Sequence, residues 1–290
     1  MVELVDTLVL GTSGASRSGS SPDVGTTSSL RIRPFSTRNR MKTLILTLGL
    51  MASFPAFGSA DSLRKLVETA ENQIRGKTFQ ADVEMKVEHD GSVRTLGLKI
   101  WTEGRDKATV KVTAPKKERG SGNLRMKLDL WQYSPNTDMI IKIPPSLMLQ
   151  SWMGSDFTND DLVRTSSLAN DYTHSSLGKD AIFGRPALKV NCVPKPEAVA
   201  TWGKVILWID EKETVPVKQE FYSENGELLK VLEGRELKTF GSHTIPTIVT
   251  MTSVRKKNAK TTMIYSAVVF DATVAANIFT QTFLRRAVGN

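Results

Sequence analysis

The hydrophobic positions change from a helical spacing to a two-residue alternation near residue 78. Asp61-Ser62 is typical of a helix N-cap and Gly76 of a helix end. Between them, apolar residues recur at three- and four-residue intervals: Leu63, Leu66, Val67, Ala70 and Ile74. The pattern predicts one amphipathic helix with an apolar surface beneath it.

Alternating apolar and polar residues from Phe79 to Val87 predict a half-buried strand. Asp90-Gly91 and Asn225-Gly226 are strong hairpin signals. Further strands are predicted at 93–101, 108–113, 123–133, 138–143, 186–193, 203–210, 215–223, 227–238, 246–254 and 260–270. The order predicts a mainly β fold with some α: a large, strongly curved antiparallel sheet, open or nearly closed, with helices over one face.

Residues 144–163 interrupt the alternation with a dense group of large apolar side chains: Leu147, Met148, Leu149, Trp152, Met153 and Phe157. A helix that begins after Pro145 would place Met148 and Trp152 on one face. The segment is either a helix that caps the core or a lid over an apolar cavity, where flexible methionines would adapt to ligands of varied shape. Composition alone favours the capping helix.

The first 60 residues are predicted to lie outside the fold. Residues 1–40 are rich in Gly and Ser, and they are interpreted as a disordered leader or as translation from a wrong start. Met41 and Lys42 then precede an apolar run, and small residues lead up to Ala60. Residues 41–60 are therefore predicted to be a signal peptide cleaved near Ala60, which leaves a single exported domain at 61–290.

The chain has 290 residues and a formal net charge of +9, which falls to +6 when residues 1–60 are set aside. In an exported protein this mild excess argues against nucleic acid as a partner and suits an anionic membrane surface or an acidic partner. Basic clusters such as Arg255-Lys256-Lys257 are either solvated loops or contacts for anionic lipid. The single cysteine, Cys192, is predicted to be a buried apolar residue without a disulfide.

The residues give little sign of an enzyme. His89, His174 and His243 lack metal-ligand spacing, and residues 61–290 contain no Gly-x-Ser-x-Gly elbow and no phosphate-binding glycine loop. Asp160 and Asp161 are interpreted as helix-capping residues. The prediction is a protein without catalytic residues, metal or cofactor.

Several motifs resemble the LolA-like family of outer-membrane lipoprotein-sorting proteins. They are Trp101 with Arg105, Thr113-Ala114-Pro115, the Leu130-Trp131 strand that ends at Pro135, the whole of 143–162, and Leu207-Trp208-Ile209-Asp210. The resemblance implies an unclosed, curved antiparallel β-barrel whose helices cover an apolar hollow. It also implies that Arg105 ties the sheet to the lid and gates the cavity, and it favours the lid interpretation of 144–157.

The family resemblance implies a non-enzymatic periplasmic carrier that holds acyl chains of lipoproteins or lipids on their way to the outer membrane. An inner-membrane transporter, an outer-membrane acceptor and transient contact with an anionic membrane are the expected partners. The alternatives are a lipid- or lipoprotein-sensing module, an accessory protein of a lipid exporter, and a lipid hydrolase. The expected ligand-binding residues are Trp101, Arg105, Trp131, Leu147, Met148, Leu149, Trp152, Met153 and Phe157.

Overall fold

The computed structural model describes residues 60–163, 167–198 and 200–286, so the predicted leader and all but the last residue of the predicted signal peptide lie outside the described residues. The strands are β1 (Thr78–His89), β2 (Ser92–Glu103), β3 (Lys107–Ala114), β4 (Gly122–Met126), β5 (Asp129–Ser134), β6 (Met139–Lys142), β7 (Tyr172–Ile182), β8 (Arg185–Pro194), β9 (Lys204–Asp210), β10 (Pro216–Tyr222), β11 (Leu228–Phe240), β12 (His243–Ser253) and β13 (Ala259–Phe270). The helices are α1 (Ala60–Gln73), α2 (Asn159–Val163), α3 (Leu168–Asp171), α4 (Gln281–Arg285) and the 3₁₀ turns η1 (Pro145–Leu147), η2 (Trp152–Gly154) and η3 (Ala276–Phe279).

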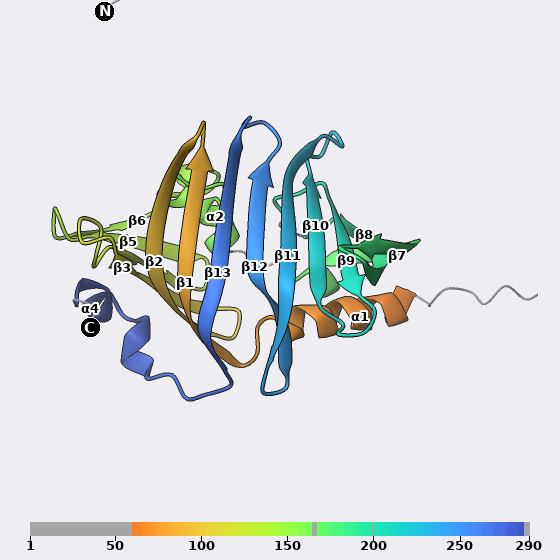
Figure 1. Ribbon diagram of the computed structural model, residues 1–290, viewed down its shortest axis with the longest axis horizontal. Coiled ribbons are helices and arrows are strands. Elements are labelled where there is room, and N and C mark those ends of the chain that lie inside the picture. Colours follow the sequence, from red (N-terminus) through yellow and green to blue (C-terminus); the bar gives the residue numbers. More distant parts are fainter. Residues whose placement is uncertain (1–59, 164–166, 199, 287–290) are drawn as a thin grey trace, which may run out of the picture. The chain divides into compact units, whose positions relative to one another are not determined.

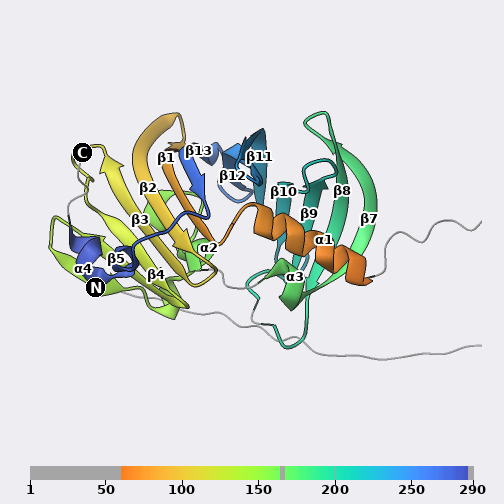
Figure 2. The same ribbon diagram turned by 90° about the horizontal axis from the view of Figure 1, so that it is seen from below.

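All thirteen strands form one antiparallel sheet in the order β6-β5-β4-β3-β2-β1-β13-β12-β11-β10-β9-β8-β7 (Figure 1). The chain starts in the middle of the sheet, runs as a meander to the edge at β6, and resumes at the opposite edge with β7. It then returns to pair β13 with β1. The two edges do not pair with each other, so the predicted unclosed, curved antiparallel sheet is confirmed (Figure 2).

This topology forces residues 143–171 to travel from one edge of the sheet to the other. The described parts, residues 143–163 and 167–171, lie across the concave face, and we call them the crossing segment. Helix α1 packs against α3 on the same face (Figure 2). The apolar side of α1 and the strands beneath it share one core cluster, whose buried members include Leu63, Val67, Ala70, Leu168, Val190, Cys192, Leu207, Phe221 and Met251. None of the described helices is long and apolar enough to cross a membrane.

The predicted helix at 61–76 is confirmed as α1, although Asp61 and Ser62 lie within its first turn instead of capping it. Gly76 ends the helical turn as predicted: it has φ = 61°, and its amide donates a hydrogen bond to the carbonyl of Asn72. Glycine is the residue that adopts this left-handed conformation without strain.

Three details of the predicted elements are wrong. Residues 123–133 form two strands, because Lys127 adopts φ = 56° and turns the chain between β4 and β5. Strand β7 was not predicted, because it is an edge strand rich in polar residues and lacks a clear alternation. The helix expected after Pro145 is absent, and two 3₁₀ turns, η1 and η2, stand in its place.

The C-terminal segment covers part of the other, convex face of the sheet. Its η3 and α4 turns contact β3 and β4. Together with these strands and their neighbours they bury an aromatic cluster, which includes Trp101, Tyr133, Phe279 and Leu284. Strands β2 to β5 are therefore covered on both faces: the C-terminal segment packs on their convex face, and the crossing segment lies on their concave face.

Candidate functional site

Two cavities of about 360 Å³ and 230 Å³ lie along the concave face of the sheet. Both are lined by Ile74, which follows α1, and by residues of the crossing segment and of strands β10, β11 and β13. Six residues line both: Ile74, Phe157, Pro216, Gln219, Leu232 and Tyr265. The two cavities thus adjoin, and we call them together the hollow. Each is within or close to the size range of ligand-binding pockets.

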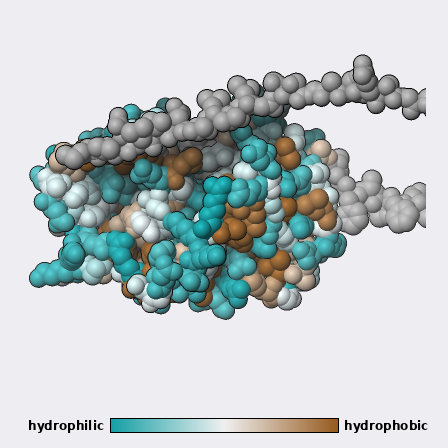
Figure 3. All heavy atoms as spheres, turned by 90° about the horizontal axis from the view of Figure 1, so that it is seen from above, coloured by the Kyte–Doolittle hydropathy of each residue, from teal (hydrophilic) through white to brown (hydrophobic). Residues whose placement is uncertain are grey.

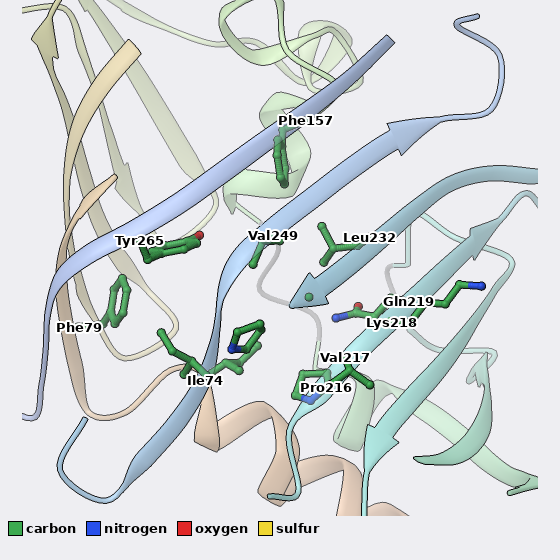
Figure 4. A pocket seen from close by; sticks show the side chains of 13 residues that line it. Ile74, Phe79, Phe157, Pro216, Val217, Lys218, Gln219, Leu232, Val249 and Tyr265 are labelled. Carbon is green, nitrogen blue, oxygen red and sulfur yellow. The ribbon is translucent and has the colours of Figure 1, made fainter. Parts of the chain in front are cut away.

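The smaller cavity is mainly apolar. Figure 4 shows Phe157 pointing into it from the crossing segment, with Phe79 and Tyr265 side by side on the strands opposite. The Phe79 and Tyr265 ring centroids are 6.1 Å apart in an edge-to-face arrangement. Burial raises the pKa of the Tyr265 phenol to about 12, so this side chain stays neutral. The cavity therefore offers mainly aromatic and aliphatic surface, with Lys218 and Gln219 as polar lining residues.

The larger cavity is apolar along the sheet and charged near α1 and β4. Its apolar lining includes Ile100, Val110, Trp152, Leu162, Leu168, Phe221, Met251 and Met263, and its charged lining residues are Glu71, Arg75, Arg125 and Asp161. An apolar hollow with a few polar groups at one side is typical of a site for an amphiphilic ligand.

The crossing segment forms part of the wall of the hollow. Trp152 is 2% exposed, and its indole Nε1 donates a hydrogen bond to Oδ1 of Asn123 on β4 at 2.9 Å. Residues 151–158 form a tight loop in which Ser151 and Thr158 pair across the chain. On one side Arg94 donates to the carbonyl of Met153, and on the other Thr261 donates to the buried carboxylate of Asp156. The loop is thus fastened to the sheet at β2, β4 and β13.

Of the nine residues expected to bind ligand, the structure places Trp152 and Phe157 in the wall of the hollow. Met153 packs against the core beside Trp152 with φ = 50°, while Leu147 and Met148 pack on Leu130 and Ile143. Leu149 is 67% exposed. The crossing segment therefore presents only part of its apolar side chains to the hollow.

The two tryptophans of the strands lie elsewhere. Trp101 and Trp131 belong to the cluster on the convex face, and the Trp101 ring packs edge-on against Phe283 of α4 at 5.6 Å. The alternation along β2 explains this position: Leu96, Leu98 and Ile100 face the concave side, so Trp101 faces away. The structure therefore does not bring these two residues to the hollow.

Arg105 connects the sheet to the covering helices. Its Nη2 lies 2.9 Å from Oε2 of Glu71 on α1, and Glu71 also accepts hydrogen bonds from the Ser167 hydroxyl and the Leu168 amide at the start of α3. Glu71 lines the larger cavity, whereas Arg105 is not among the lining residues and contacts Glu71 from the β2–β3 turn. One carboxylate thus joins the β2–β3 turn, α1 and α3 at the rim of the hollow.

Asp161 has a similar position at α2. Its carboxylate accepts from the Thr158 amide and hydroxyl, as expected for the helix-capping role predicted for it, and from Nζ of Lys230 at 2.8 Å. Neither Glu71 nor Arg125 was predicted from the sequence to be a site residue. The helical spacing places Glu71 on the polar face of the predicted helix, whereas the structure buries it among its partners, and a buried carboxylate needs such partners.

The three histidines lie apart from one another, and none of them is among the described residues that line the hollow. His89 lies at the end of β1 beside Asp90, while His174 bonds the Leu168 carbonyl and has a pKa lowered by burial. His243 bonds Asp271 at the far end of β12. Within the described ranges, no three His, Cys, Asp or Glu residues are placed to hold a metal ion.

The chain matches one protein family and several solved structures. A family model described as "uncharacterized protein" matches residues 104–286, which is more than half of the chain, and the chain belongs to that family. A DUF1329 family protein from Desulfovibrio piger is 17% identical, with a TM-score of 0.71 over 79% of this chain and 100% of that one. No curated protein matches the chain in sequence.

Two further solved structures share the fold. An outer membrane lipoprotein-sorting protein domain from Vibrio parahaemolyticus is 21% identical, with a TM-score of 0.69 over 79% of this chain and 100% of that one. A LolA superfamily protein from Nitrosomonas europaea is 24% identical, with a TM-score of 0.63 over 78% and 100%. The fold is thus LolA-like, and the resemblance inferred from the sequence motifs is confirmed at the level of the fold. At these identities the comparisons establish the fold, and the function is argued from the site.

Proposed function

We propose that this protein is a non-enzymatic carrier that holds acyl chains of a lipid or lipoprotein in the hollow. The observation that carries the proposal is the pair of adjoining apolar cavities between the concave face of the sheet and the helices that cover it. Each CH₂ group moved from water into such a hollow contributes roughly 0.8 kcal/mol. A chain of ordinary length therefore gains ample binding energy without any directed polar contact.

The location we propose is the periplasm, reached by means of residues 41–60. The LolA-like fold, which is shared with an outer membrane lipoprotein-sorting domain, supports this location. A carrier between two membranes also needs a surface that remains hydrophilic around its apolar site. On the face seen in Figure 3, hydrophobic residues gather in groups bordered by hydrophilic ones. A transporter that loads the protein and an acceptor that unloads it remain part of the proposal.

The experiment is a lipid extraction from protein purified with its host membranes, followed by mass spectrometry. A carrier yields acylated species in a fixed ratio to protein, and it transfers them from donor to acceptor vesicles. A sensor of the same fold would bind these species but would not transfer them. An empty hollow after purification, together with no uptake from donor vesicles, would overturn the proposal.

A further inference from the structure

Arg125 is the one charged side chain in the wall of the larger cavity for which the described residues supply no hydrogen bond or ion pair. It lies on β4 and is 4% exposed. Its Nε is buried without a hydrogen-bond partner, and none of its nitrogens lies within 4.0 Å of a described carboxylate oxygen. Burial lowers the pKa of this guanidinium and the field of Asp106 raises it, but an arginine remains charged in proteins.

The two carboxylates that line this cavity already have ion-pair partners. Glu71 is held by Arg105, and Asp161 is held by Lys230. Neither carboxylate pairs with Arg125, so the wall of the larger cavity keeps a buried guanidinium without a hydrogen bond or ion pair from the described residues, in the field of Asp106. A buried charge without a partner is costly, and in native proteins such a group points to a missing ligand or ion.

The sheet register leaves room in front of the guanidinium. Arg125 on β4 is directly opposite Ala108 on β3, and Ala108 is opposite Thr102 on β2. All three line the cavity. A small methyl group and a hydroxyl therefore lie next to Arg125, where a larger side chain would fill the space. Ile100 and Val110 form the next row along the same strands and begin the apolar part of the hollow.

We propose that Arg125 binds the anionic group, a phosphate or a carboxylate, of an amphiphile whose acyl chain occupies the apolar remainder of the hollow. Guanidinium groups pair with both oxyanions through parallel hydrogen bonds that fix orientation. This inference rests on the proposed carrier function and deepens it, because it names the chemical class of the cargo: an anionic lipid. The acyl chain supplies affinity, and Arg125 selects the head group.

The test compares decyl phosphate, decanoate and decanol as ligands of the purified protein, with binding measured by calorimetry and by tryptophan fluorescence. The wild type binds the two anions about tenfold or more tightly than decanol, as expected for a charge-assisted contact. R125M loses this preference and keeps its affinity for decanol. R255M, which changes an arginine of the exposed β12–β13 turn, keeps the preference of the wild type.

A purely structural role for Arg125 predicts something different. If the arginine only stabilised the fold, R125M would be less stable and would bind decanol more weakly as well. Under the proposal, ligand-free R125M is as stable as the wild type or more stable, because a buried unpaired charge is removed. R125K keeps the positive charge but lacks the planar guanidinium, and it replaces R125M in the test if R125M does not fold. R125K should prefer the anions over decanol less strongly than the wild type does, but the preference should not disappear.

The outcomes separate this inference from the carrier function. Equal wild-type affinity for decanol and decyl phosphate overturns the head-group site and leaves the carrier intact. Failure to bind any of the three decyl ligands overturns the carrier function itself. Inorganic phosphate is the fourth probe: if it binds as tightly as decyl phosphate, the site takes free phosphate, and the anionic-lipid inference is overturned.

Discussion

The guanidinium of Arg105 in the β2–β3 turn holds the carboxylate of Glu71 on helix α1, with 2.9 Å between Nη2 and Oε2. Because Glu71 also accepts from Ser167 and Leu168, this contact joins the sheet to two of the elements that cover the hollow. One shared carboxylate therefore links α1 and α3 to the β2–β3 turn, so a change at Glu71 affects both helices.

Replacing Glu71 by Gln is expected to lower the free energy of unfolding by about 1–3 kcal/mol, since buried donors lose a charged acceptor. A double-mutant cycle with Arg105→Met measures the coupling, expected at about 0.5–3 kcal/mol. The control is Glu68→Gln on the same helix, where Arg64 and Glu68 are 36% and 42% exposed and the change should stay below about 0.5 kcal/mol. Equal effects at Glu71 and Glu68 would refute the joining role.

Trp152 fastens the crossing segment to the sheet through Asn123. Trp152→Phe should reduce stability by about 1–3 kcal/mol, because the buried Asn123 Oδ1 loses its donor. Amides of residues 151–158 should also exchange faster with solvent. The double variant Trp152→Phe with Asn123→Leu removes both partners and should recover much of the loss. If urea denaturation shows no recovery, the hydrogen bond is not what fastens the segment.

Lys111 fastens the C-terminal segment on the convex face. It is fully buried and donates to the carbonyls of Gly120 and Leu284, and burial lowers its pKa to about 8. In the unfolded chain the pKa of lysine is about 10.4, so between pH 8 and 9.5 the unfolded state binds more protons than the folded state. By linkage, the free energy of unfolding rises with pH across this window.

The measurement is urea denaturation of the wild type and of Lys111→Met at several pH values. The wild type should gain stability relative to the variant between pH 8 and 9.5, by no more than about 2 kcal/mol. Below pH 8 lysine is protonated in both states and the difference should level off. A constant difference from pH 6 to 9.5 would show that Lys111 has an ordinary pKa.

Cys192 is buried in the core under α1, and burial raises the pKa of its thiol to about 12. Because the thiolate is the reactive form, a thiol reagent at pH 8 should label the native protein very slowly and the urea-unfolded protein within minutes. The structure confirms that Cys192 is buried, as predicted from the sequence. The labelling rate measures whether the thiol is also unreactive. Rapid labelling under native conditions would contradict a closed core at α1.

Most helices and strands could be predicted from the sequence, but the face of the sheet on which each side chain lies could not. The helix at 61–76 and most strands follow from local spacing, whereas the position of Trp101 depends on which face of β2 turns inward. Both faces of that strand are covered, one by the crossing segment and one by α4, so alternation of hydrophobicity does not distinguish them. Ile100 faces the hollow, and its neighbour Trp101 therefore faces the opposite side of the sheet.

The position of Arg125 in the wall of the cavity could not be predicted from the sequence for a related reason. Its neighbours Leu124 and Met126 look like the interior of a strand, and an arginine between them is usually solvated. Only the tertiary structure shows that α1 and the crossing segment close over this face and bury the guanidinium. Likewise, the path of residues 143–171 across the concave face follows from the pairing of β1 with β13, which links residues far apart in sequence.

A bulky side chain that blocks the hollow between the sheet and its covering helices should prevent acyl chains from binding there. Leu232→Trp places an indole where both cavities meet, and Leu128→Trp makes the same change at a 69% exposed turn. In a titration with a fluorescent long-chain fatty acid, the wild type and Leu128→Trp should bind tightly, and the dissociation constant of Leu232→Trp should be about tenfold higher or more. Equal binding by all three folded proteins would contradict acyl-chain binding in the hollow.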